Sequence, residues 1–143
     1  MSREAIYSAL FARLQAAYAW NLSGRVLLHW SDVDALQQPA MFQTQSTEVV
    51  QRITRQPAKL MMNVKVYIYA HSQTAAGRAP SSVLNDLIDA IWNAMKPDAA
   101  HLETQTLGGL VEWARIEGAI ETDEGLLGDQ AVAIVPIAIL TAA

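Results

Sequence analysis

The chain contains no cysteine, which excludes disulfide bonds, thiolate metal ligands and cysteine nucleophiles. Charged residues are also scarce: they make up 17% of the 143 residues, while 52% are hydrophobic. An average globular chain has about 25% charged residues, so this composition predicts that another chain covers part of the surface. The apolar residues nevertheless form no run of the roughly 20 that a membrane-spanning helix needs, and the first residues lack the continuous apolar core of a signal peptide. We therefore expect a soluble protein, made in the cytoplasm, with no membrane partner.

Basic residues are few and dispersed. The formal net charge is −4 and the sequence pI is about 5.2. Without a basic stripe, direct recognition of nucleic acid is not expected. Arg52, Arg55 and Lys59 form one small basic group, which we interpret either as a solvated loop or as a contact for an acidic protein partner; a nucleic-acid contact is the weakest of the alternatives.

Motifs that carry chemistry are missing as well. The sequence has no GxSxG, Walker or GxGxxG motif, and its three histidines are not at metal-ligand spacing. Carboxylates are densest at Glu117, Glu121, Asp123, Glu124 and Asp129. Such hard oxygen ligands bind divalent cations, so one alternative is a small metal-dependent enzyme that uses the turn at 121–129. A solvated turn is the simpler interpretation, and we expect no enzyme activity, cofactor or metal.

Hydrophobic periodicity predicts two helices. The first spans residues 2–20, with Ser2 as its N-cap and apolar side chains at helical spacing. The second spans about 81–96 and ends before Pro97. Its predicted buried stripe is Leu84, Leu87, Ile88, Ile91, Trp92 and Met95.

Five segments are predicted to be strands, namely 25–30, 40–45, 59–71, 110–121 and 130–140. The clearest is 59–71, where apolar and polar side chains alternate throughout. Residues 46–57 are predicted to form a long polar loop, 122–129 a turn, and Gly108-Gly109 a turn or bulge with positive φ. This order predicts one α+β domain over 1–143, a single mixed or antiparallel sheet of about five strands with two helices packed on one face.

The last predicted strand, QAVAIVPIAIL, is almost wholly apolar. A strand of this kind is expected where both sheet faces are covered, and two helices cover only one. Pro136 cannot donate to a ladder, which places it at an edge or a bulge. A second copy of the chain would cover the other face, so we predict a homo-oligomer. Trp and Arg are common anchors of protein interfaces, which adds Trp113 and Arg115 to the predicted contact. The predicted subunit interface consists of Trp113, Arg115, Val135, Pro136, Ile137 and Ile139.

Four stretches resemble the tail terminator proteins of long-tailed bacteriophages, which are also called minor tail or tail completion proteins. The longest is QTLGGLVEWARIEGAIETDEGLLGDQAVAIVPIAIL at 105–140. The others are REAIYSALFARL, LHWSDVDALQQPAMFQ and KLMMNVKVYIYAH. The resemblance covers nearly the whole chain and includes no catalytic signature.

The resemblance implies a structural virion protein at the neck end of the tail, assembled in the host cytoplasm. Proteins of this family form a ring, typically a hexamer, that caps the tail tube and stops its polymerisation. The implied partners are the tail tube protein and a head-completion or connector protein. The charged residues Arg52, Arg55, Asp123 and Glu124 are the predicted contacts with these partners. Another head–tail connector or a tube component is the alternative function.

Overall fold

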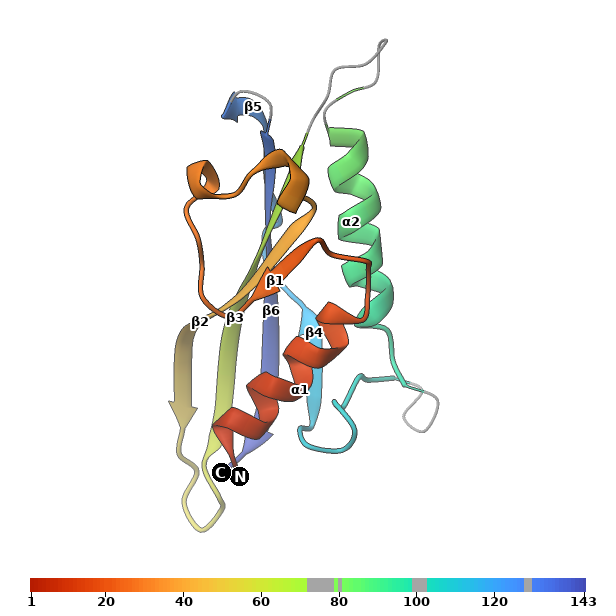
Figure 1. The fold of residues 1–143 in the computed structure, drawn as a ribbon. Coiled ribbons are helices and arrows are strands. Elements are labelled where there is room, and N and C mark those ends of the chain that lie inside the picture. Colours follow the sequence, from red (N-terminus) through yellow and green to blue (C-terminus); the bar gives the residue numbers. More distant parts are fainter. Residues whose placement is uncertain (72–78, 80, 99–102, 128–129) are drawn as a thin grey trace.

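The computed structural model describes residues 1–71, 79, 81–98, 103–127 and 130–143. Within them, two helices pack on a six-stranded sheet (Figure 1). The helices are α1 (Arg3–Gln15) and α2 (Ser81–Ala94). The strands are β1 (Leu22–Gly24), β2 (Ala40–Gln51), β3 (Lys59–His71), β4 (Trp113–Ile116), β5 (Glu121–Leu127) and β6 (Gln130–Ala142). Two short 3-10 turns, Trp30–Asp32 and Ala35–Gln37, lie between β1 and β2.

The sheet is mixed. Its order is β1-β2-β3-β6-β4, and β5 also pairs with β6. Only the β1–β2 pair is parallel among the described strands; the other pairs are antiparallel. The central pair, β3 with β6, stays in register from Lys59 opposite Ala142 to His71 opposite Gln130. The predicted α+β class and single sheet are confirmed, with six strands where about five were predicted.

The core lies between the sheet and both helices. It combines apolar side chains of α1 and α2 with one alternating set from β3 and β6. Ser2 caps α1 as predicted, since its Oγ accepts a hydrogen bond from the Ala5 N–H at 3.2 Å. Trp92 was predicted to be buried but is 55% exposed. It lies about 100° around the helix from Ile91, outside the buried stripe.

Four predicted segments were wrong. Residues 25–30 form no strand; the chain there leaves the sheet after Gly24. Residues 46–51 are not a loop but continue β2, after a bulge between Gln45 and Glu48. The strand predicted at 110–121 is interrupted around Gly118, whose φ is +114°, and splits into β4 and the start of β5. The predicted turn at 122–129 is strand as far as Leu127.

Both ends of the chain lie at the hairpin that connects β2 and β3 (Figure 1). The Arg3 side chain forms an ion pair with Glu48 at 3.0 Å. The Ala143 N–H donates to the Ala58 carbonyl at 2.8 Å. We call this the hairpin end of the molecule. Among the described residues, no helix is long and apolar enough to span a membrane.

Candidate functional site

The face of the sheet opposite the helices carries a row of apolar side chains at the hairpin end. Strand register places Val49 beside Met61, Met61 beside Leu140, and Leu140 beside Trp113. The four therefore cross four strands at one level and point to one side, because side chains opposite each other in a ladder share a face. Val49 is 57% exposed and the other three are partly exposed. We call these four residues the open row.

The other half of the same face is covered by the segment 25–38 (Figure 1). Val33 packs there with Ala40, Phe42 and Tyr69. The Tyr69 hydroxyl donates to the Leu28 carbonyl at 2.8 Å, and burial raises the pKa of this tyrosine. The chain thus covers one half of this face itself and leaves the open row without a cover in the described structure.

Charged side chains border the open row. The Arg115 guanidinium lies 3.8 Å from the centroid of the Trp113 ring, a cation–π contact, and pairs with Glu117 at 3.0 Å. Lys59 forms an ion pair with Glu112. An apolar centre with aromatic and arginine side chains and a charged rim is the composition of a protein-binding surface.

Pro136 lies where the neighbour of β6 changes. β5 pairs with residues 130–134 and β4 with residues 137–140. The Glu117 N–H donates to the Pro136 carbonyl at 3.2 Å, so this carbonyl points toward β4 and β5 and away from β3. In an antiparallel ladder the nitrogen and the carbonyl of one residue point to the same side, so the proline nitrogen also points away from β3. The ladder to β3 therefore loses no donor. Pro136 is at an interruption of the partner strand, not at the edge of the sheet.

The six predicted interface residues divide into two groups. Val135, Ile137 and Ile139 are at most 1% exposed and belong to the core beneath the helices. The two helices of the same chain therefore cover this face of the apolar strand. Trp113, Arg115 and Pro136 lie on the accessible side, and for them the subunit interface stays a prediction.

The charged residues predicted to contact partners lie at opposite ends of the molecule. Arg52 and Arg55 are exposed at the hairpin end, beside the exposed Ile53, and neither has an ion-pair partner in the described structure. Asp123 pairs in register with Val132 at the far end of β6, and Glu124 follows it as an exposed residue of β5. One end therefore presents cations and the other carboxylates.

The acidic segment provides no metal site among the described residues. Nowhere in that part of the chain do three or more His, Asp or Glu side chains come together as ligands. The Asp123 carboxylate accepts a hydrogen bond from the Gly125 N–H at 3.2 Å. Asp129, the last member of the predicted cluster, lies outside the described residues.

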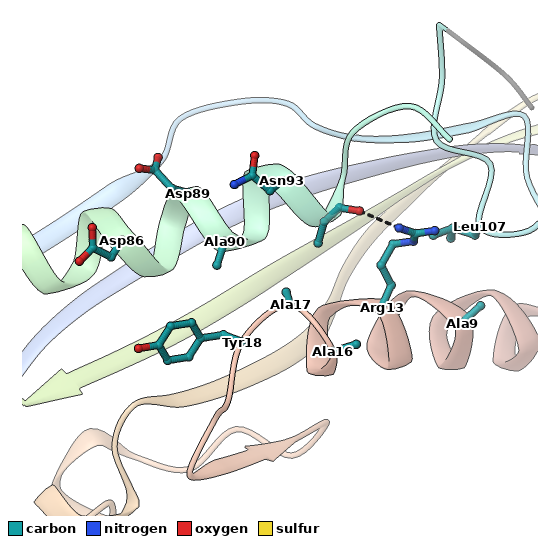
Figure 2. A pocket seen from close by; sticks show the side chains of 11 residues that line it. Ala9, Arg13, Ala16, Ala17, Tyr18, Asp86, Asp89, Ala90, Asn93 and Leu107 are labelled. Atoms are coloured by element: carbon teal, nitrogen blue, oxygen red, sulfur yellow. Dashed lines mark hydrogen bonds between the residues drawn. The ribbon is translucent and has the colours of Figure 1, made fainter. Parts of the chain in front are cut away.

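An open cleft of about 800 Å³ lies between α1 and α2 (Figure 2). Alanines line much of it, and Arg13 donates from Nη1 to the Ala94 carbonyl at 3.0 Å, which joins α1 to the end of α2. Asp86 and Asp89 stand on its α2 side. The described lining includes no histidine, serine or threonine as a nucleophile or base, so the cleft has no acyl-transfer constellation there.

Sequence reasoning missed Val49, Met61 and Leu140 as surface residues. The alternation of 59–71 already placed Met61 on the face opposite the core. The row itself depends on strand pairing, which periodicity does not provide.

The fold is similar to that of a chain in a solved virion structure. Over 98% of this chain and 96% of the other, it matches a chain of a solved structure described as "Virion of native gene transfer agent (GTA) particle". The TM-score is 0.55 and the sequence identity is 11%, a likeness of fold. No protein-family model matches the sequence. No curated protein matches it either.

Proposed function

We propose that this chain is a structural virion protein, a tail terminator that forms a ring on the end of a phage-like tail tube. The observation that supports a structural virion protein is the match of nearly the whole fold to a chain from a gene transfer agent virion. The finer role, a tail terminator, comes from the sequence resemblance of four stretches of the chain to that family. The open row supports it, because a surface with four apolar side chains and a stacked Trp113–Arg115 pair is suited to contact another protein.

A ring requires separate surfaces for its neighbours in the ring and for its axial partners. Trp113, Arg115 and Pro136 belong to the subunit contact in this proposal. The hairpin end, with Arg52 and Arg55, faces one axial partner, and the β5 end, with Asp123 and Glu124, faces the other. Opposite charges at the two ends favour a fixed orientation between the tube protein and the head-completion protein.

Light scattering after gel filtration, combined with negative-stain imaging, tests ring formation. At protein concentrations of tens of micromolar, we expect a closed ring. The family resemblance implies that the ring has six subunits. A stable monomer of 15.6 kDa would overturn ring formation as a property of the isolated chain.

Addition of the purified protein to growing tail tubes tests the terminator role. Tubes should stop elongating, and the protein should be found at one tube end only. Incorporation along the tube would instead identify a tube component. Rings that bind head-completion protein but not tubes would identify a different head–tail connector.

A further inference from the structure

The segment 25–38 has two sides with different surroundings. Its inner side, with Val33 and Trp30, packs on the sheet. Its outer side carries apolar residues with no cover in the described structure: Leu36 is 91% exposed and Val26 is 74% exposed. Leu27 and Leu28 are also exposed. We call Val26, Leu27, Leu28 and Leu36 the outer patch. Exposed apolar side chains that gather on one part of a surface mark a candidate site of protein–protein contact.

Charges beside the outer patch and beside the open row are complementary. Asp32 and Asp34 are exposed on the segment and have no ion-pair partner in the described structure. Lys65 is exposed on the same sheet face as the open row and also has none. Arg115 is a second cation there and pairs with Glu117 at 3.0 Å, while Lys59 pairs with Glu112. The outer patch is thus accompanied by two carboxylates, and the open row by Lys65, a cation that no ion pair in the described structure neutralises.

One chain cannot bring these two surfaces together. The segment 25–38 is held over the Tyr69 end of the sheet by the Tyr69–Leu28 hydrogen bond and by Gln130, whose Nε2 donates to the Trp30 carbonyl at 3.0 Å. The open row crosses β3 at Met61, about 26 Å away along the strand. A second copy, displaced along the sheet face, can place its outer patch on the open row.

We propose that the outer patch of one copy packs on the open row of the next, with Asp32 and Asp34 facing Lys65 and Arg115. This rests on the proposed ring and identifies its subunit contact. Because the two surfaces differ, the contact is heterologous, and its repetition gives a ring when the rotation between neighbouring copies closes. Each copy then covers the half of its neighbour's sheet face that the neighbour leaves open.

Cross-linking tests the pairing directly, since the natural chain has no cysteine. Leu36→Cys and Val49→Cys replace exposed side chains, so the fold should not change. A mixture of the two variants, treated with a short bismaleimide, should give a cross-linked dimer, and a chain carrying both changes should give a ladder of oligomers. Each single variant alone should stay uncross-linked, because copies of one surface do not meet in a heterologous contact.

Val50→Cys is the matched control. Val50 is next to Val49 and similarly exposed, but its register partner is Leu60, on the helix side of the sheet. Mixed with Leu36→Cys, it should give no dimer. Equal cross-linking from Val49→Cys and Val50→Cys would overturn the pairing.

The outcomes separate this inference from the proposed function. Rings in the parent protein without Leu36–Val49 cross-links would overturn the pairing and leave ring formation standing. Cross-links in open chains, without closed rings, would support the pairing and contradict the ring. Cross-links within Leu36→Cys alone would show a symmetric contact and overturn the heterologous one. A monomeric parent protein with no cross-links would overturn both the pairing and intrinsic ring formation.

Charge reversal provides an independent readout. Lys65→Glu should raise the dissociation constant between subunits about fivefold, as expected for one exposed ion pair. Adding either Asp32→Lys or Asp34→Lys, whichever faces residue 65, to the same chain should recover affinity, whereas adding both should not, because one lysine would then face Arg115. Asp86→Lys with Asp89→Lys, on α2, is the control and should leave assembly unchanged. Equal effects of the control and of Lys65→Glu would contradict the proposed charge pairing.

Discussion

Gly118 is the residue that allows the chain to pass from β4 to β5. Its φ of +114° lies in a region that side chains rarely adopt, and a Cβ there would be 3.3 Å from Cγ of Pro136. Gly118→Ala should therefore lower the free energy of unfolding by about 1–3 kcal/mol. Urea unfolding followed by tryptophan fluorescence measures this.

Gly125→Ala is the control for that substitution. Gly125 lies on β5, and a Cβ added there would have no described heavy atom within 4 Å. A similar loss of stability in both variants would contradict the explanation by strain and contact at Gly118.

Tyr7 should make stability sensitive to alkaline pH. Burial, and the neighbouring Glu48 carboxylate 3.3 Å from its hydroxyl, raise the pKa of Tyr7 in the folded chain. The folded state then holds the phenolic proton more tightly than the unfolded state, whose pKa is about 10. This contribution is complete below about pH 10 and is lost as pH rises through the folded-state pKa.

Tyr7→Phe should consequently reduce the loss of unfolding free energy between about pH 8 and pH 11. Chemical denaturation at both pH values measures the difference. Tyr18→Phe changes an exposed tyrosine and should lose as much unfolding free energy between the two pH values as the parent protein. If Tyr7→Phe also follows the parent, the raised pKa does not contribute to alkaline unfolding.

At the scale of elements, the outer part of the β2–β3 hairpin is fixed to α1 by Glu48. This carboxylate accepts from Arg3 Nε at 3.0 Å and from the Tyr7 hydroxyl. Glu48→Ala should increase amide hydrogen exchange within residues 46–58 while the centre of β3 and β6 stays protected. The effect on global stability should be below about 1 kcal/mol, because the ion pair is partly exposed.

Glu117→Ala breaks an ion pair of the same kind with Arg115 and is the matched control. Exchange in residues 46–58 should not respond to it. A uniform increase over the whole sheet in Glu48→Ala would show that the hairpin does not open separately.

Sequence patterns predicted elements well where one face is buried along the whole element. β3 has the predicted bounds, Lys59–His71, because its alternate side chains enter the core throughout. Residues 46–51 of β2 were missed because their side chains are mostly exposed on both faces of this strand, so that no burial imposes alternation. The interruption at Gly118 was missed because apolar residues continue on both sides of it.

At the scale of the whole molecule, the open row was not predictable, because Val49, Met61, Leu140 and Trp113 become neighbours only through strand register. Assembly through this row should protect Met61 from peroxide. Met61 is partly exposed in the single chain, whereas Met41 and Met62 are fully buried there. Thioether oxidation requires access to the sulfur.

Peptide mass spectrometry after peroxide treatment should show Met61 oxidised in subunits diluted below their dissociation constant and protected in the ring. Met41 and Met62 serve as internal controls, slow to react in both states. Equal oxidation of Met61 in both states would place the row outside any subunit contact.

The position of both chain ends beside the hairpin gives the particle a built-in marker of direction. A peptide tag fused to Met1 or to Ala143 would stand next to Arg52 and Arg55, far from Asp123. Gold-labelled antibody against such a tag would decorate one rim of a ring. On an assembled particle, the label would show by its height along the axis whether the cationic rim faces the tube or the head.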